Sequence, residues 1–273
     1  MIDAHQHIWA IGQNGCVWPT RAEEPIFRDY GLDDFGAVAA PLGVTRTVLV
    51  QSQEDPRDTQ WLLGLADAAA AVAAVVGWAN LAAPDAPAQV AMLAARPKLR
   101  SLRPMVQDRA PDWYDDLALE PGLDAMADHG LRLDALVRVP HLAALDRLAG
   151  RMPALPIVID HAAKPRIGAE GGLAEWHSAI APLSARANVS CKLSGLLTEC
   201  GEARAEAVQP YIAAILELFG PDRVMWGSDW PVLELASTYA NWLDLAHSGV
   251  PAAVHEAVFA GTAARFYGLG EAP

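Results

Sequence analysis

The sequence predicts an α/β protein of the (β/α)8 or TIM-barrel class, formed as a single domain over residues 1–273. Short β-rich runs alternate with Ala- and Leu-rich helical stretches, a pattern that indicates a parallel sheet. Eight such runs occur, which is the number of strands in this barrel. A chain of 273 residues that is 52% hydrophobic is long and apolar enough to fill its core.

Each expected strand is a short run rich in β-branched and apolar residues, and no Gly/Ser linker interrupts the series. Intervening stretches such as 58–72 and 206–220 carry apolar residues at helical spacing. In chain order, we expect strands within residues 2–9, 45–52, 74–81, 99–107, 131–139, 155–165, 188–196 and 222–231.

Composition excludes several classes of function. The net charge is −13 and no dense Lys/Arg segment appears, which argues against nucleic-acid partners and anionic membranes. Cys16, Cys191 and Cys200 are sparse and lack CxxC spacing, as in a reducing compartment. The apolar stretch 68–79 is too short to span a bilayer, and no signal peptide is expected after Met1. We therefore expect a cytoplasmic protein, and a homo-oligomer remains open.

Residues 10–31 form a long irregular stretch after the first expected strand. Loops of this length are uncommon unless they have a function. Its position places it at the C-terminal face of a barrel, where active sites lie. We expect either a pocket wall that includes Trp18 and Arg21 or a packed surface loop.

Polar side chains follow or end most of the expected strands. His5 and His7 lie at i and i+2, so a strand directs both to one face. A barrel gathers the C-terminal ends of its strands at one mouth. The convergent residues are His5, His7, Gln51, Arg103, Gln107, Asp134, Asp160, His161, Lys164, Lys192, Ser194, Ser228 and Asp229.

Three of these motifs also resemble a known family. HQH at 5–7, IDH followed by KP at 159–165, and MWGSDWP at 225–231 resemble the amidohydrolase superfamily, and most closely the sugar-lactone hydrolases of its amidohydrolase-2 branch. VLVQS, VVGWANL, SLRPMVQ and CKLSGLLTE resemble that group in the same order, so the likeness spans almost the whole chain. It implies a (β/α)8 barrel that hydrolyses lactones of sugar acids.

The resemblance restricts the choice of metal. Two-metal members of the superfamily use a lysine on strand four and a histidine on strand five, and this chain has neither there. At most one divalent ion, Zn²⁺ or Mn²⁺, is expected among His5, His7, His161 and Asp229. Members of the similar lactonase group include enzymes that hydrolyse without metal, so a requirement stays open. No organic cofactor is expected.

If the chain hydrolyses a lactone, each of the four convergent residues has an expected role. Asp229 is the expected base toward water and the later acid toward the ring oxygen, aided by desolvation between Trp226 and Trp230. His5, His7 and His161 are expected to polarise the carbonyl, directly or through one ion.

Other polar and aromatic residues are expected to bind the sugar. An Arg fork suits an oxygen-rich ligand, although a salt bridge from Arg103 to Asp134 or to another carboxylate of the barrel is the structural alternative. Lys164 and Lys192 are alternatively ion-pair partners, and Asp160 alternatively anchors a loop. The expected substrate-binding residues are Arg103, Gln51, Gln107, Lys164, Trp18, Trp113 and Trp230.

Other functions compete with the lactonase interpretation. A decarboxylase of the same branch would need a tightly held metal, and Arg103 would bind the substrate carboxylate. A nuclease of the superfamily fits poorly with the acidic charge. A barrel that only binds a ligand would use the same groups, and it would keep its affinity in Asp229→Asn, whereas an enzyme would lose turnover.

Overall fold

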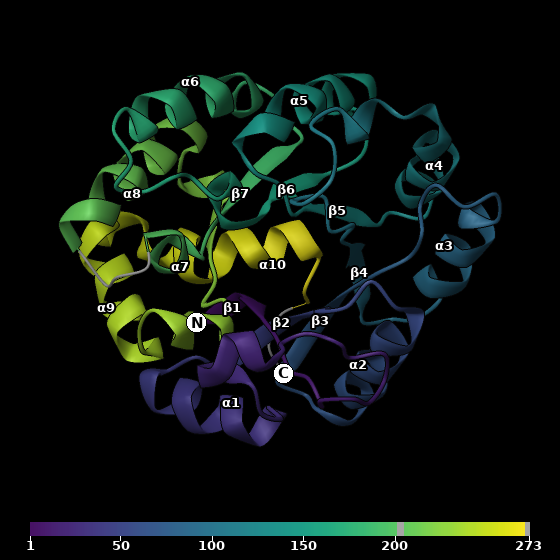
Figure 1. The fold of residues 1–273 in the computed structure, drawn as a ribbon, viewed down its shortest axis with the longest axis horizontal. Helices are drawn as coiled ribbons and strands as arrows, with labels where there is room; N and C mark the ends of the chain where they lie inside the picture. Colours follow the sequence, from purple (N-terminus) through teal and green to yellow (C-terminus); the bar gives the residue numbers. More distant parts are fainter. Residues whose placement is uncertain (201–204, 271–273) are drawn as a thin grey trace.

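The computed structural model describes residues 1–200 and 205–270, and its strands form the expected barrel (Figure 1). One parallel sheet contains the strands in sequential order, with helices outside it. Every strand overlaps the run predicted for it. The strands are β1 (Ile2–Gln6), β2 (Arg46–Val50), β3 (Val72–Gly77), β4 (Leu99–Leu102), β5 (Arg132–Ala135), β6 (Ile157–Ile159), β7 (Val189–Leu193) and β8 (Val224–Trp226).

The barrel closes between its first and last strands. The backbone N–H of Asp229 donates to the carbonyl of His5 at 2.8 Å, and that of His7 donates to the carbonyl of Trp230 at 2.8 Å. These bonds lie just beyond the end of β8. The seam therefore places the histidines of β1 beside Asp229, as neighbouring first and eighth strands require.

Alternating side chains of the strands fill the barrel. Ile2 and Ala4 of β1, with Val48 and Val50 of β2, belong to a buried cluster separate from the larger core outside the sheet. Tyr267, in the last helix, packs against the same cluster. The register between β1 and β2 shifts between Asp3 and Gln6, which interrupts this alternation. His5 therefore faces the same interior as Ile2 and Ala4, where its Nδ1 lies near Lys192.

The helices surround the sheet, and local sequence determines several of their ends. In the second helix, Asp55 accepts a hydrogen bond from the backbone N–H of Arg57, and Pro56 stands at its first position. The helices are α1 (Leu32–Ala39), α2 (Pro56–Ala68), α3 (Ala86–Ala94), α4 (Glu120–Asp128), α5 (Leu142–Arg151), α6 (Gly172–Ser184), α7 (Leu196–Cys200), α8 (Ala205–Phe219), α9 (Tyr239–Gly249) and α10 (Thr262–Tyr267). Among the described residues, no helix is long and apolar enough to cross a membrane.

The alanine-rich segment after α2 differs from the prediction. The helix ends at Ala68, where the spacing predicted a helix to residue 72, and Val72 already begins β3. Alanine fits a helix well on intrinsic preference. Here Ala69 is extended, and the following valines are buried in the sheet.

The long segment 10–31 is an ordered arm at the mouth of the barrel. Trp9 and Tyr30 form an antiparallel bridge at its base, and Trp9 donates from Nε1 to the carbonyl of Arg28 at 2.8 Å. A short 3₁₀ helix, Arg21–Ile26, lies within it. Trp18 lines the pocket described below, whereas Arg21 does not.

Candidate active site

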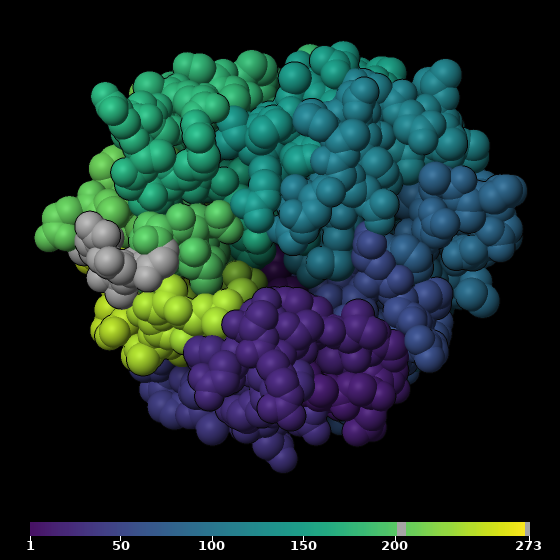
Figure 2. Space-filling view, in the orientation of Figure 1, coloured from purple at the N-terminus to yellow at the C-terminus, as the bar shows by residue number. Residues whose placement is uncertain are grey.

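A pocket of about 360 Å³ opens at the C-terminal ends of the strands. Figure 2 shows a hollow near the centre of one face, bordered by the purple N-terminal segment. This volume lies in the range of small-molecule sites. Its lining residues are His7, Trp18, Ser52, Arg103, Met105, Gln107, Asp108, Leu136, His161, Lys164, Asp229 and Val232.

β1 and its extension supply two imidazoles to the site. His5 is fully buried and His7 nearly so, and their Nε2 atoms lie 3.1 Å apart. The Nδ1 of His7 lies 2.8 Å from the carbonyl oxygen of Val50, which is only an acceptor. This contact fixes the His7 proton on Nδ1 and leaves its Nε2 lone pair facing the site.

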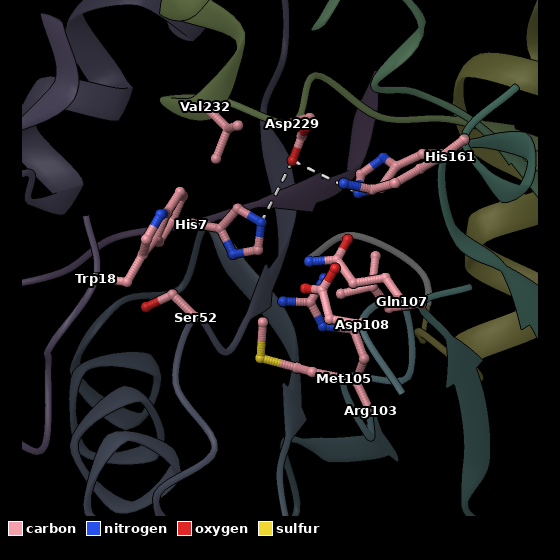
Figure 3. A pocket seen from close by; sticks show the side chains of 12 residues that line it. His7, Trp18, Ser52, Arg103, Met105, Gln107, Asp108, His161, Asp229 and Val232 are labelled. Atoms are coloured by element: carbon pink, nitrogen blue, oxygen red, sulfur yellow. Dashed lines mark ion pairs between the residues drawn. The ribbon is translucent and has the colours of Figure 1, made fainter. Parts of the chain in front are cut away.

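His161 and Asp229 reach the site from strained backbone. His161 has φ +52° and Asp229 has φ +59°, in the left-handed region that non-glycine residues rarely adopt. Residues 162–164 continue this conformation after β6. Such strain is concentrated at functional sites. Here it turns both side chains toward the pocket (Figure 3).

The four predicted residues converge on one oxygen. Asp229 Oδ1 lies 3.4 Å from His7 Nε2, 3.7 Å from His5 Nε2 and 3.8 Å from His161 Nε2. Figure 3 shows Asp229 between His7 and His161, with their ion pairs dashed. The structure thus brings together the four side chains that the sequence analysis placed at the ends of strands one, six and eight.

This donor set fits a divalent ion. His5, His161 and Asp229 each offer a ligand atom, and all three atoms lie within 4.8 Å of one another. Two ligands of a tetrahedral zinc ion, at zinc–ligand distances near 2.1 Å, are separated by about 3.4 Å. The 3.4–3.8 Å spacings around Asp229 Oδ1 are close to that value. The residues therefore match zinc in chemistry and in spacing.

Burial keeps the imidazoles neutral. It lowers the pKa of His161 to about 4 and the pKa of His7 below its ordinary value. The pKa of His5 is lowered further, by burial first and then by the charge of Lys192. Neutral rings offer both a lone pair and an N–H, so the site has donors and acceptors near neutral pH.

The base strength of Asp229 differs from the expectation. Its burial does act to raise its pKa, as expected for a desolvated carboxylate. Attractions to His161, His7 and His5 outweigh burial, and the net pKa lies below the ordinary value. Trp230 packs edge-on against Tyr30. The imidazoles, rather than desolvation by tryptophan, therefore control Asp229, which stays ionised.

A buried charge network supports the floor of the site. Lys192 Nζ lies 2.5 Å from Asp134 Oδ2 and 3.0 Å from Asp160 Oδ1. Arg103 pairs with Asp160 at 3.4 Å, so the salt bridge to a barrel carboxylate is formed, with Asp160 rather than Asp134 as the partner. Asp160 is inside the barrel and contacts His5 at 3.4 Å, so it does more than anchor a loop.

Two buried polar atoms near the pocket lack a partner in the described structure. They are Nε of Arg103 and Oε1 of Gln107, one a donor and the other an acceptor. Both residues line the pocket. Buried polar groups are normally hydrogen-bonded, so unpaired ones at a cavity indicate a ligand. Lys164, also in the lining, pairs with Glu199 at 3.5 Å.

Several predicted contacts lie outside the lining. Gln51 is buried and donates from Nε2 to the carbonyl of Arg103 at 2.8 Å. Trp113 packs edge-on against Tyr114, Trp230 is buried against Tyr30, and His5 lies below the surface of the pocket. The lining residues that sequence reasoning missed are Ser52, Met105, Asp108, Leu136 and Val232. Ser52 and Asp108 directly follow the predicted residues Gln51 and Gln107, and Leu136 directly follows the end of β5, which is the signal that could have found them.

A family comparison covers nearly the whole chain. The family model described as amidohydrolase matches residues 2–269 of the chain. The chain belongs to the amidohydrolase family. This match includes every strand of the barrel and all four convergent residues.

Individual relatives are more specific. The chain is 50% identical over 247 residues to an L-fucono-1,5-lactonase of Burkholderia ambifaria, covering 89% of this chain and 85% of the relative. It is 34% identical to an L-fucono-1,5-lactonase of Burkholderia multivorans, covering 99% and 96%. A crystal structure of an amidohydrolase from B. multivorans with bound zinc has a TM-score of 0.93 at 34% identity, over 98% of this chain and 99% of that one.

Proposed function

We propose that this amidohydrolase opens the ester ring of a sugar-acid lactone, with an L-fucono-1,5-lactone type of substrate. The observation that carries the proposal is the convergence of three imidazoles on the Asp229 carboxylate beside a 360 Å³ pocket. Half of the aligned residues are shared with an L-fucono-1,5-lactonase, which supports the same substrate class.

The residues perform hydrolysis in two proton transfers. Ionised Asp229 takes a proton from water, which attacks the lactone carbonyl carbon and forms a tetrahedral adduct. The His161 imidazole and the Arg103 guanidinium, which line the pocket, stabilise the resulting oxyanion. The carbon–oxygen bond of the ring then breaks, and Asp229 returns its proton to the departing alkoxide oxygen. Because an ester has a better leaving group than an amide, a carboxylate of low pKa is an adequate base.

A divalent ion is compatible with the same residues. His5, His7, His161 and Asp229 would hold it, and Zn²⁺ or Mn²⁺ suits their nitrogen and oxygen donors. When bound, such an ion polarises the carbonyl and acidifies water. The chelation experiment described below tests whether hydrolysis requires the ion.

The pocket wall supplies contacts for a polyhydroxylated ring. Arg103 Nε and Gln107 Oε1 are placed to donate to and accept from substrate oxygens, since neither has a protein partner in the described structure. Trp18 offers an aromatic face at the opposite side of the pocket (Figure 3). Lys164 contributes a cation partly balanced by Glu199. Gln51 acts through the Arg103 carbonyl rather than on substrate.

We also propose that the protein acts in the cytoplasm on a small molecule alone. The thiols of Cys16 and Cys191 are free and buried, as in a reducing compartment. The net charge of −13 opposes binding to nucleic acid or anionic lipid.

The substitution Asp229→Asn tests the proposed function. With a panel of aldonolactones and a pH indicator, kcat should fall by about 10²–10⁴-fold, because the amide is not a base. Asp124→Asn, on the outer face of α4, makes the same charge change and should leave the rate unchanged. Wild-type turnover in Asp229→Asn would overturn the mechanism.

Chelation separates the remaining alternatives. Lactone hydrolysis that persists after loss of metal assigns carbonyl polarisation to the protein groups, and hydrolysis restored only by Zn²⁺ or Mn²⁺ assigns it to the ion. No turnover on any lactone, with carbon dioxide released from a carboxylic acid, would favour the decarboxylase. Ligand binding without turnover in the wild type would favour the binding protein.

A further inference from the structure

The buried ammonium of Lys192 has a distinctive set of partners beneath the pocket. Its Nζ lies 2.5 Å from Asp134 Oδ2, 3.0 Å from Asp160 Oδ1 and 3.1 Å from His5 Nδ1. All four side chains are fully buried, so water does not compete for these contacts. A lysine ammonium has three N–H donors and no acceptor. Each donor therefore faces one neighbour.

We propose that Lys192 is a positioning residue that holds His5 in the tautomer with its proton on Nε2. An ammonium can only donate to Nδ1, so Nδ1 carries the lone pair. In a neutral imidazole the proton is then on the other nitrogen. His5 consequently presents an N–H donor, rather than a lone pair, to His7 and Asp229.

The contact between the two histidines supports this assignment independently. His5 Nε2 and His7 Nε2 lie 3.1 Å apart, a hydrogen bond that needs one proton between them. His7 cannot supply it when neutral, because its own proton is on Nδ1 and donates to Val50. His5 must therefore be the donor. The contact of Lys192 with His5 and the contact of Val50 with His7 therefore both place the His5 proton on Nε2.

Two longer contacts favour the opposite tautomer. Asp160 Oδ1 lies 3.4 Å from His5 Nδ1, and Arg103 Nη1 lies 3.4 Å from His5 Nε2. Each is 0.3 Å longer than the competing contact on the same nitrogen. The opposite tautomer would also direct the His5 Nδ1 proton at a Lys192 proton, leaving a buried donor unpaired at a cost of about 1–3 kcal/mol. The shorter contacts therefore determine the tautomer.

This arrangement has a consequence for metal binding. A metal ion on His5 needs the Nε2 lone pair, so binding would force the proton to Nδ1 against Lys192. Lys192 thus favours His5 as a hydrogen-bond donor in the catalytic centre and weakens its use as a ligand. The inference rests on the proposed function for the role of the centre, but the tautomer itself is independent of substrate.

Nitrogen NMR of the wild-type protein labelled with ¹⁵N-histidine tests the tautomer directly. The His5 signals are assigned by their absence in His5→Gln. At neutral pH we expect a protonated Nε2 and an unprotonated Nδ1 for His5. A protonated Nδ1 in the wild type overturns the proposal, and this outcome does not depend on any variant folding.

The double variant Lys192→Met/Asp134→Asn tests the cause. It removes one positive and one negative charge together, so the remaining network keeps its balance. We expect loss of the Nε2–H preference and zinc affinity at least about tenfold tighter by calorimetric titration. Unchanged NMR signals and unchanged zinc affinity would overturn the role of Lys192.

A matched lysine variant and the lactone assay complete the design. Lys98→Met removes a lysine that bonds the carbonyls at the end of α2, away from the site, and should change neither readout. If the wild type has the expected tautomer but opens no lactone, the proposed function fails and the inference stands. If it opens lactones with Nδ1 protonated, the inference alone fails.

Discussion

Asp58 shows how a residue behind the pocket sets part of its shape. Its carboxylate accepts hydrogen bonds from the backbone N–H groups of Ser52 and Gln53, at 3.0 and 3.3 Å. Ser52 lines the pocket, so this bond fixes one side of it. Burial raises the pKa of Asp58 to about 6, from an ordinary value of 3.8.

This raised pKa predicts a pH-dependent stability. The folded protein holds the Asp58 proton more tightly than the unfolded chain does, so the stabilisation is complete below about pH 4 and is lost as the pH rises through 6. The shift corresponds to about 3 kcal/mol. Between pH 4 and pH 7, urea unfolding should show Asp58→Asn gaining up to about this amount relative to the wild type.

The control for this measurement is an exposed carboxylate. Asp124→Asn, on α4, should differ from the wild type by the same amount at both pH values. A stability difference for Asp58→Asn that is constant from pH 4 to pH 7 would contradict a raised pKa.

At the residue scale, the sequence predicted the convergent groups better than the pocket wall. His5, His7, His161 and Asp229 follow from the shared mouth of a barrel, whereas strand alternation alone does not place His5, because the register of β1 shifts between Asp3 and Gln6. Trp230 does not follow in this way, because Asp229 is left-handed and the alternation of side chains ends there. The sequence also left open which barrel carboxylate pairs with Arg103, and the structure shows Asp160 in that place. That choice depends on side-chain reach across the barrel, which the sequence does not reveal.

Among the elements, the turn after β7 carries the closest packing against the site. Gly195 has φ +64°, and a Cβ there would lie 2.6 Å from Cγ and Nδ1 of His161. Ser194, the preceding residue, contacts the same Nδ1 at 2.9 Å. A glycine at 195 is therefore required both by the backbone and by the ring of His161.

Gly195→Ala should reduce lactone hydrolysis and stability together. The left-handed alanine costs about 1–2 kcal/mol, and the overlap with His161 adds to it. We expect a fall in kcat of at least about tenfold, with a lower midpoint in urea. Gly64→Ala, at an exposed position in α2 with nothing within 4 Å, should instead stabilise the protein by up to about 1 kcal/mol. Equal effects of the two substitutions would refute the packing argument.

Element prediction succeeded for strand order and failed at some boundaries. Every strand was found because buried β-branched runs separated by helical stretches are a strong signal. The start of β3 was missed because alanine does not distinguish a helix end from a strand start. The runs predicted around β6 and β8 were too long, since they included the turns that carry His161 and Asp229.

At the scale of the whole molecule, the last helix seals the barrel. α10 lies across the centre of the ring of strands in Figure 1, and its Tyr267 packs with strand residues of the barrel interior. The number of strand runs predicted the barrel. The sequence did not predict this seal, because it depends on a contact between residues 134 and 267 that lie far apart in the chain.

Tyr267 of α10 also contacts the buried charge network beneath the site. Tyr267 donates from its hydroxyl to Asp134 Oδ2 at 2.7 Å, and the same oxygen accepts from Lys192. A hydrogen bond to a charged group contributes about 1.5–3 kcal/mol. This bond therefore links α10 to the β5–β7 side of the barrel. Its loss should lower the free energy of unfolding of the whole domain.

Tyr267→Phe should lower the free energy of unfolding by about 1.5–3 kcal/mol in urea, because one buried bond to Asp134 is lost without loss of the ring. Tyr114→Phe is the matched control. The Tyr114 hydroxyl is buried without a hydrogen-bond partner in the described residues, so its removal should leave stability unchanged or raise it. A cost for Tyr267→Phe no greater than that of Tyr114→Phe would mean that α10 is held by apolar packing alone. A cost in the expected range would make the charge network part of what closes the barrel as well as what orients His5.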